Sequence, residues 1–318
     1  MIPFLCHFMD EVVILSDGRV TTCCMDPMGE NCFGSIYEDS FKTIEENLRD
    51  IRERVSRDVN ALPRCRICYK KISASNFPDT GMYKINFSEN ERIEYLKKHS
   101  RIHKLVIETS SVCNLKSNGC MQSRFDIPAH RNAKLLDLEH TAVLLENHLD
   151  QIETIRLYNY GETFFNKQSI PFIHKIKFLS QDTRIAIATN GMLLNSESKQ
   201  KSLVRSGADR LLFSIHGGSQ QSVEPYMTSD FDFEKVVSIL KNLVRFRNDI
   251  GLSTPLLQWK YLLFEWNDSD QEINKAIQTA EKIGMDGIQF TLPGYPAPSQ
   301  KYKASPEKMT ALSRNFPS

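Results

Sequence analysis

The segment 110–124 contains side chains that could bind a metal. Its sequence, SSVCNLKSNGCMQSR, places Cys113 and Cys120 seven positions apart, with the hydroxyl of Ser117 between them. Thiolates bind iron and zinc because a metal readily lowers the cysteine pKa, which is ordinarily about 8.5. A serine hydroxyl is a weaker acid and a harder ligand. The segment is therefore a metal site with one ligand missing, a site that has lost its metal, or a loop with two unrelated cysteines.

All eight cysteines lie in the first 120 of the 318 residues. A disulfide framework suits a small secreted chain, whereas clustered cysteines in a reducing cytosol are more often metal ligands or redox groups. Four of them are well separated and could supply four thiolates to one metal site, namely Cys6, Cys23, Cys65 and Cys68. A hairpin that carries one thiol and a CxxC pair that carries two more also build four-thiolate zinc sites.

Composition and charge favour a soluble globular protein, with 41% apolar residues, 25% charged residues and a net charge of +1. No basic stripe suggests nucleic acid, and no polybasic cluster suggests a membrane surface. The first residues, MIPFLCHFMDEVVIL, lack the basic start of a signal peptide, and no apolar run reaches about 18 residues. These features predict a cytoplasmic protein without a nucleic-acid or membrane partner.

The first 100 residues show an irregular pattern of short elements. Two apolar runs around Asp17-Gly18 predict a hairpin over 11–24. The spacing of apolar residues predicts an exposed helix over 40–59 and a polar helix over 88–100. The CxxC pair falls in 62–70, which we expect to be a short turn.

From residue 104 onward, strands and helices alternate regularly. The predicted strands cover 103–109, 154–160, 183–190, 209–217, 256–266 and 287–293. Such alternation predicts an α/β fold with a parallel sheet and right-handed crossovers. Six units favour a partial (β/α)6 barrel over 101–318, preceded by a small cysteine-rich auxiliary-cluster domain over 1–100. Ligands of such sheets bind at the carboxyl ends of the strands.

The loop after the first of these strands, TSSVCNLKSNGCMQSR, resembles the radical S-adenosylmethionine (SAM) signature CxxxCxxC. Cys113 and Cys120 match its first and third positions, and Ser117 stands at the second. The resemblance implies a [4Fe-4S] cluster whose open iron is chelated by the amino and carboxylate groups of SAM. It does not decide whether Ser117 is an engineered change, an unusual working ligand, or a mark of a degenerate family member.

The later strand ends extend this resemblance to residues 104–295. YNYGETFF resembles the family's GGE-type motif, with tyrosine in place of the first glycine, and implies that Gly161 and Glu162 bind the ammonium group of SAM. ATNGMLL resembles the third strand ending, which implies a hydrogen bond from Asn190 to a ribose. FSIHGGSQQSVEPYM resembles the fourth, which implies a SAM contact at Ser214, with His216 in place of an acid. Read alone, each of these stretches is also an ordinary turn or a structural side chain.

The N-terminal cysteines resemble those of the auxiliary-cluster domains called SPASM and twitch. The resemblance rests on the GxxxxC spacing from Gly18 to Cys23 and on the later CRIC pair. It implies an auxiliary [4Fe-4S] cluster held by Cys6, Cys23, Cys65 and Cys68, although the sequence alone leaves zinc open. Cys24 is then a spare neighbour, and we expect Cys32 to be buried as a small apolar residue. These domains commonly follow the barrel, whereas here the matching residues precede it.

Two functions follow as hypotheses. The first is a radical SAM enzyme that forms a 5′-deoxyadenosyl radical and abstracts hydrogen from a small molecule, such as a sugar or nucleoside, or from a peptide. It would need an external electron donor, and Ser117 would impair it. The second is a non-catalytic iron–sulfur or zinc protein that uses the same scaffold as a binding partner.

Overall fold

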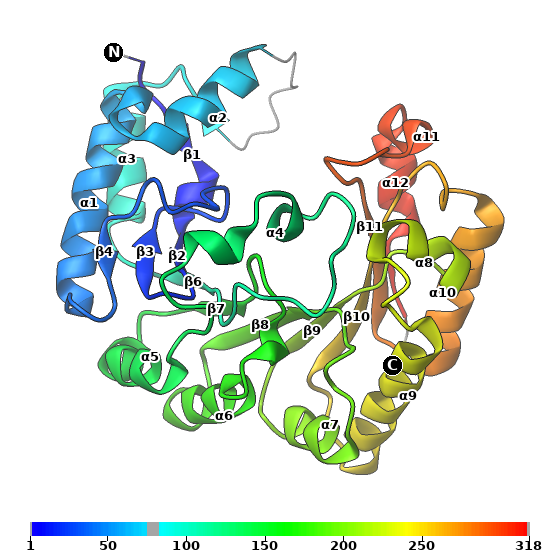
Figure 1. Cartoon of the computed structure of the whole chain (residues 1–318). Helices are drawn as coiled ribbons and strands as arrows, with labels where there is room; N and C mark the ends of the chain where they lie inside the picture. Colours follow the sequence, from blue (N-terminus) through cyan, green and yellow to red (C-terminus); the bar gives the residue numbers. More distant parts are fainter. Residues whose placement is uncertain (1, 75–82, 317–318) are drawn as a thin grey trace.

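The computed structural model describes residues 2–74 and 83–316, which form an α/β molecule around one large sheet (Figure 1). The sheet has ten strands in the order β12-β11-β10-β9-β8-β7-β6-β2-β3-β4. A separate antiparallel ribbon is made by β1 (Leu5–Cys6) and β5 (Tyr83–Lys84). No helix within the described ranges is long and apolar enough to cross a membrane.

Six neighbouring strands make up the parallel part of the sheet, and their order in space follows their order in the chain. They are β6 (Lys104–Ile107), β7 (Thr154–Leu157), β8 (Arg184–Thr189), β9 (Arg210–Ser214), β10 (Leu256–Leu262) and β11 (Gly287–Thr291). At its far edge, β12 (Arg314–Asn315) pairs antiparallel with β11. The prediction of an α/β chain with a parallel sheet is confirmed.

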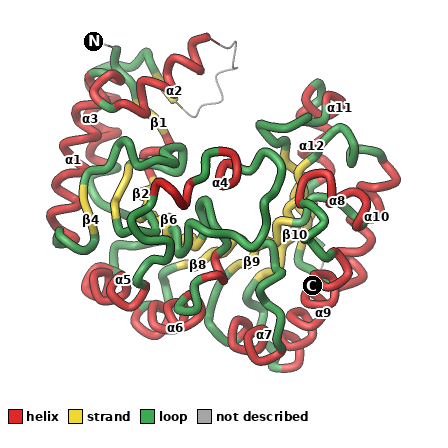
Figure 2. The backbone as a smooth tube through the Cα atoms, in the orientation of Figure 1, coloured by secondary structure: helices red, strands yellow, loops and turns green. Residues whose placement is uncertain are grey.

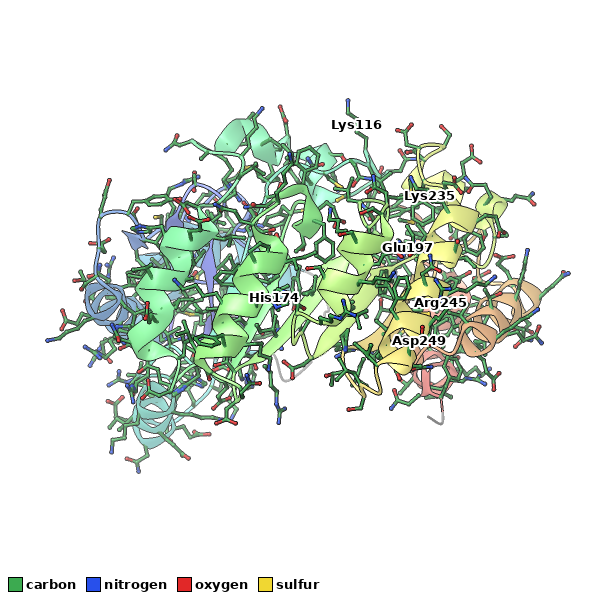
Figure 3. All side chains as sticks on the ribbon, turned by 90° about the horizontal axis from the view of Figure 1, so that it is seen from below. Lys116, His174, Glu197, Lys235, Arg245 and Asp249 are labelled. Carbon is green, nitrogen blue, oxygen red and sulfur yellow. The ribbon has the colours of Figure 1, made fainter. Side chains whose placement is uncertain are left out.

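Helices connect these strands and cover the outer side of the curved sheet (Figures 1 and 2). They are α5 (Leu138–Leu145), α6 (Ser169–Leu179), α7 (Glu197–Val204), α9 (Phe233–Asp249), α10 (Asp270–Ile283) and α12 (Pro306–Leu312). Further helices occur in the loops: α4 (Met121–Arg124), α8 (Gln220–Met227) and α11 (Gln300–Lys303). Seen from below, the outer layer carries an ion pair of 3.8 Å between Arg245 of α9 and Glu197 of α7 (Figure 3).

The two faces of the parallel strands differ in exposure. Every second side chain of a strand faces the helices, and those side chains, such as Phe213, Trp259 and Phe290, are almost fully buried in one large core. Their neighbours in sequence point to the opposite face, which we call the inner face, because successive side chains of a strand alternate. Residues of the inner face, including Ser214 and Lys260, remain partly exposed.

The N-terminal region joins the same sheet. The predicted hairpin is confirmed as β2 (Glu11–Ile14) and β3 (Arg19–Thr21), with β4 (Gly34–Ser35) beside β3. On its other edge, β2 pairs in parallel with β6, so that Ile14 lies opposite Ile107. One continuous apolar core contains Ile14 and Phe41 together with Leu105 and Leu145. The sheet therefore continues across the sequence position at which we expected a domain boundary, near residue 100.

Three helices complete the N-terminal region, α1 (Phe41–Arg57), α2 (Pro63–Ala74) and α3 (Glu89–Lys98). Two of them confirm predicted helices, and α1 begins where the Ser40 hydroxyl accepts a hydrogen bond from the Thr43 amide. The expected turn over 62–70 is wrong, because residues 63–70 lie in α2. Proline is well suited to the first position of a helix, where its missing N–H costs no hydrogen bond, and Pro63 begins α2.

Candidate metal and cofactor site

The loop after β6 is fixed at its far side by contacts with two other loops. Asn118 donates two hydrogen bonds, one from its backbone amide to the Tyr226 carbonyl at 2.7 Å and one from its side-chain amide to the Pro225 carbonyl at 2.7 Å. Gly119 has a φ of +78°, and a Cβ there would lie 2.6 Å from the Tyr295 ring. These contacts hold the segment between Cys113 and Cys120 over the carboxyl edge of the sheet.

Gly161 lies where the first two loops of this edge touch. A Cβ at Gly161 would lie 2.1 Å from the carbonyl oxygen of Ser110, so only glycine allows this approach. The next backbone amide, that of Glu162, donates to the Val112 carbonyl at 2.9 Å. The loop after β7 is thereby placed directly against the segment that leads into Cys113.

Glu162 is buried, and its carboxylate connects two strand ends. One carboxylate oxygen accepts from the Thr189 hydroxyl at 2.6 Å and from the Phe164 amide at 3.2 Å, and the other accepts from the Asn190 amide at 2.8 Å. Burial raises the pKa of the Glu162 carboxyl, and the hydrogen bonds from Thr189 and Asn190 oppose this rise. The Glu162 carboxylate therefore connects the ends of β7 and β8, whereas the sequence resemblance implied only a contact with SAM.

Asn190 and Cys113 are in contact across this edge. The side-chain amide of Asn190 donates to the side-chain oxygen of Asn114 at 2.9 Å and lies 3.7 Å from the Cys113 sulfur. The Leu115 backbone amide also donates to that sulfur, at 3.4 Å. Burial raises the pKa of the Cys113 thiol to about 11, and the Leu115 donor opposes the rise. Two N–H groups directed at one sulfur suit a thiolate ligand, because such bonds stabilise its charge.

Cys120 and Ser117 close the other end of the segment. The Cys120 amide donates to the Ser117 carbonyl at 3.2 Å, and Cys120 precedes the first residue of α4. A charge on Cys120 contributes to the raised pKa of Cys113, so the two thiols lie within electrostatic reach of each other. Both Ser117 and Cys120 are partly exposed.

Ser214 and His216 stand at the end of the fourth parallel strand, and the His216 ring lies 5.3 Å from that of Tyr226, whose carbonyl accepts from Asn118 of the loop after β6. Ser214 ends β9 and lies opposite Lys260 of β10 on the inner face. His216 is buried, and its Nδ1 accepts a hydrogen bond from the Leu262 amide at 3.2 Å. Burial lowers the pKa of His216 to about 3, so the imidazole is neutral at ordinary pH. His216 therefore does not supply the charge of an acid at this position.

The N-terminal thiols gather beside β1, α2 and the turn after β3. Cys23 and Cys65 are buried, whereas Cys6 and Cys68 are partly exposed. Burial is the main cause that raises the pKa of Cys65 to about 12, and charges on Cys6 and Cys68 add to it. The Asn31 side-chain amide lies 3.6 Å from the Cys65 sulfur. Since Cys65 and Cys68 are three positions apart on α2, they share one side of that helix.

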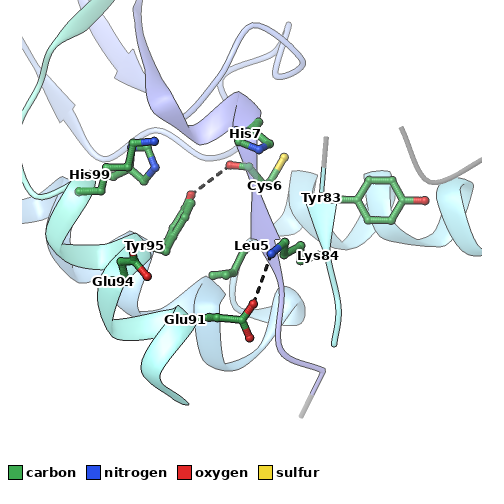
Figure 4. Close-up of a pocket in the computed structure, with 10 residues that line it drawn as sticks. Leu5, Cys6, His7, Tyr83, Lys84, Glu91, Glu94, Tyr95 and His99 are labelled. Atoms are coloured by element: carbon green, nitrogen blue, oxygen red, sulfur yellow. Dashed lines mark hydrogen bonds and ion pairs between the residues drawn. The ribbon is translucent and has the colours of Figure 1, made fainter. Parts of the chain in front are cut away.

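A pocket of about 260 Å³ opens beside Cys6 (Figure 4). It lies between β1, β5 and α3, where the Tyr95 hydroxyl donates to the Cys6 carbonyl at 3.0 Å. Across residues 2–74 and 83–316, no group of three or more His, Cys, Asp or Glu side chains is arranged as a metal site. The thiols are thus near one another but not in coordination geometry, and the ligand sets inferred from the sequence stay predictions.

Comparison with protein families identifies this N-terminal region. Residues 6–69 match the family SPASM, described as an iron-sulfur cluster-binding domain. The chain contains a SPASM region. The resemblance drawn from the GxxxxC and CRIC spacing is confirmed, and the match covers all four predicted auxiliary ligands, Cys6, Cys23, Cys65 and Cys68.

Solved structures similar to the chain include two whose descriptions name SAM, also written AdoMet. The structure described as native anSMEcpe with bound AdoMet has 15% identity and a TM-score of 0.46, over 61% of this chain and 54% of that one. The radical SAM methyltransferase TsrM from Kitasatospora setae has 12% identity and a TM-score of 0.47, over 63% and 38% of the two chains. Methylornithine synthase (PylB) has 13% identity and a TM-score of 0.43, over 66% and 62%.

One curated protein also matches part of the chain. It is named GTPase Obg, from Brachyspira hyodysenteriae, and is 27% identical over 169 residues. These residues make up 52% of this chain and 24% of that protein, so the chain spans about a quarter of its length. The 318 residues contain no GxxxxGK[ST] sequence, the loop that binds phosphates in many GTPases.

The SPASM region contacts the sheet edge through residues that sequence reasoning did not select. The Tyr160 hydroxyl donates to the Cys24 carbonyl, which connects the residue before Gly161 with the turn that carries Cys23. Burial and the charges of Cys24 and Cys23 raise the pKa of Tyr160. Cys24 is therefore at the junction of the two regions. Cys32, expected to be buried, is exposed, and its thiol donates to the Gly34 carbonyl at 3.3 Å.

A buried ion pair supports the same junction. Both side chains of Arg131 and Glu108 are fully buried, with 2.7 Å between Arg131 Nε and one carboxylate oxygen of Glu108. That carboxylate also accepts from the Ser16 backbone amide at 3.1 Å and from the Asn159 side chain at 2.8 Å. Glu108 thus joins the hairpin of the SPASM region to the loops after β6 and β7. Arg131 lies in an irregular loop, where the sequence gives no periodic signal for such a partner.

Proposed function

We propose that the chain is a radical SAM enzyme with a second, auxiliary iron–sulfur cluster in its SPASM region. The observation that carries the proposal is the meeting of Cys113, Cys120, Glu162 and Asn190 at one edge of a parallel sheet. These residues belong to three separate strand ends. The match of residues 6–69 with an iron–sulfur cluster-binding family supports the auxiliary site independently.

The chain's own residues fit such a cofactor at the sheet edge. Cys113 and Cys120 would hold the cluster, with the Ser117 hydroxyl at the third ligand position. When bound, a [4Fe-4S] cluster and SAM supply the electron and the 5′-deoxyadenosyl radical for hydrogen abstraction from a substrate. The Asn190 and Leu115 N–H groups stabilise negative charge on the Cys113 sulfur. Glu162 fixes the ends of β7 and β8 relative to each other.

The proposal includes an architecture and a set of partners. The six parallel strands would form a partial (β/α)6 barrel over 101–318, with the auxiliary region over 1–100 closing the β6 side. The inner face would receive a small-molecule or peptide substrate, and an external electron donor would supply electrons. We expect the protein to act in the cytoplasm, without a nucleic-acid or membrane partner.

The Ser117→Cys variant tests the proposal. Cysteine keeps the shape of the serine side chain and replaces oxygen by a softer, more acidic atom. We expect this variant to bind roughly four more iron atoms per chain after anaerobic reconstitution, the content of one [4Fe-4S] cluster. It should also start the reductive cleavage of SAM to 5′-deoxyadenosine, with little or none in the unmodified protein. Its electron paramagnetic resonance signal should change when SAM is added.

A matched control places a new thiol elsewhere on the sheet. Ser253 is exposed in the loop before β10, at the opposite edge of the sheet, and Ser253→Cys should leave the iron content unchanged. Full SAM cleavage by the unmodified protein would mean that the serine is a competent ligand or that another residue completes the site. No gain in the Ser117→Cys variant would favour the alternative function, a non-catalytic iron–sulfur or zinc protein that acts as a binding partner.

A further inference from the structure

The inner face of the sheet is polar and partly exposed at its centre. Parallel sheets in α/β proteins are ordinarily covered on both faces, so their central strands are apolar on both sides. Here the inner side of β9, β10 and β11 carries Ser214, Lys260 and Gln289 at one level. All three are partly exposed. Adjacent strands lie about 4.8 Å apart, so the three side chains stand next to one another in a row.

Lys260 in this row has no carboxylate partner among residues 2–74 and 83–316, since no ion pair or hydrogen bond of its ammonium group is found there. Burial alone lowers the pKa of Lys260, without an opposing effect from any acid. Lys260 also acts electrostatically on His216, which is neutral. A cation held at the centre of a sheet without a counter-charge is costly unless a ligand supplies one.

Other polar atoms on these strands also lack a hydrogen-bond partner. The carbonyl oxygen of the Gln258 side chain and the hydroxyl of Thr291 are buried and make no hydrogen bond within the described part of the chain. Farther along the inner face, Arg210 Nε is also buried without a hydrogen-bond partner. By contrast, Arg156 on β7 has a carboxylate partner, Glu11. Two cationic side chains of the inner face, Lys260 on β10 and Arg210 on β9, therefore have no carboxylate partner in the described part of the chain, and the amide oxygen of Gln258 and the Thr291 hydroxyl add no charge.

We propose that Lys260 binds an anionic group, a carboxylate or a phosphate, of a small molecule held over the inner face. Ser214 and Gln289 flank Lys260 and can hydrogen-bond the same group. Two molecules of the proposed function can carry this anion, namely SAM through its carboxylate and the substrate itself. The assignment of the anion to one of them rests on the proposed function, whereas the anion site does not.

The test measures two ligands separately. Inorganic phosphate is titrated by calorimetry into the full chain before any reconstitution with iron, and SAM is titrated into the reconstituted protein. The variants are Lys260→Met, which removes the charge at similar length, and Lys260→Arg, which keeps it. Lys241→Met is the matched control, because Lys241 is exposed on the outer helix α9. Near-ultraviolet circular dichroism, which reports Trp259 beside Lys260, checks that each variant is folded.

We expect Lys260→Met to weaken the binding of at least one ligand about tenfold or more, the effect of a lost hydrogen bond to a charged group. Lys260→Arg and Lys241→Met should change it by less than about threefold. Loss of phosphate binding alone assigns the anion to the substrate, and loss of SAM binding alone assigns it to SAM. Unchanged affinity for both ligands in Lys260→Met, or no saturable phosphate binding together with unchanged SAM affinity, would overturn the proposal.

These outcomes are separate from failure of the proposed function. If no cluster forms and SAM is not cleaved, the phosphate titration still decides whether Lys260 is an anion site, since it uses the chain without iron. Conversely, if Lys260→Met cleaves SAM with full affinity and also binds phosphate as the unmodified protein does, the enzyme function stands and the anion site is removed.

Discussion

Replacing Gly161 with alanine should separate the first two loops of the sheet edge. The new methyl group would lie 2.1 Å from the Ser110 carbonyl oxygen and 2.8 Å from the Val112 carbonyl oxygen, where an ordinary contact begins at 3.4 Å. The loops must therefore open by about 1.3 Å, the difference between 3.4 and 2.1 Å. Both obstacles are backbone atoms, so rotation of a side chain cannot relieve the clash.

The expected cost follows from this displacement. Overpacking of this kind destabilises a protein by about 1–3 kcal/mol. At about 2–4 °C per kcal/mol for domains of 150–250 residues, the melting temperature of Gly161→Ala should fall by roughly 2–12 °C. Cys113 follows Val112 directly, so its sulfur should also move, and a misplacement of about 1 Å can cost a hundredfold in rate.

Thermal unfolding followed by circular dichroism measures the first effect, and iron bound after anaerobic reconstitution measures the second. Gly294→Ala is the matched control, because no atom lies within 4 Å of a Cβ at Gly294. If Gly161→Ala melts within about 1 °C of the unmodified protein and binds as much iron, the two loops do not touch as described, and the reasoning about the site fails.

Three further changes probe separate parts of the molecule. Glu162→Gln should weaken SAM binding about tenfold or more. It should also lower the free energy of unfolding by about 1–3 kcal/mol, because it replaces a carboxylate that accepts from three internal donors. Unchanged SAM affinity in titrations would exclude Glu162 from the cofactor site. Replacing Cys65 and Cys68 together with alanine should lower iron and sulfide content, and equal metal content would refute the auxiliary site. Hydrogen bonds from His99 and Lys104 hold the pKa of Asp10 well below its usual range. The Asp10 carboxylate therefore contributes to the free energy of unfolding above about pH 4, and this contribution is lost as the pH falls further. In Asp10→Asn, the melting temperature should fall less steeply as the pH is lowered below about 4, and an unchanged slope would contradict this.

The parallel sheet could be predicted because its signal repeats. Each strand from β6 to β11 is a short apolar run followed by a helical pattern, and six repeats leave few alternative topologies. The same regularity explains why Glu162 and Asn190 could be expected near Cys113. Residues that follow successive parallel strands must emerge at the same edge of the sheet, whatever lies in the loops.

The features that could not be predicted depend on contacts between distant residues or on weak local signals. The hairpin pattern predicts the partner of β2 on one edge only, and nothing local indicates that its other edge pairs with β6. The CxxC helix was missed because Pro63 and two cysteines resemble a turn, although proline is also compatible with the start of a helix. The buried pair of Glu108 and Arg131 joins residues 23 positions apart through an irregular loop.

The parallel pairing of β2 with β6 constrains the order of events during synthesis. Ile14 cannot find its neighbour until Ile107, 93 positions later, has left the ribosome. Until then, the hairpin that carries Cys23 has one unpaired edge, and such edges are prone to join other chains. Contacts between residues so far apart in sequence also form slowly. Correct placement of the N-terminal thiols therefore waits for the first strand of the parallel sheet, and metal delivered before that moment meets an incompletely formed site.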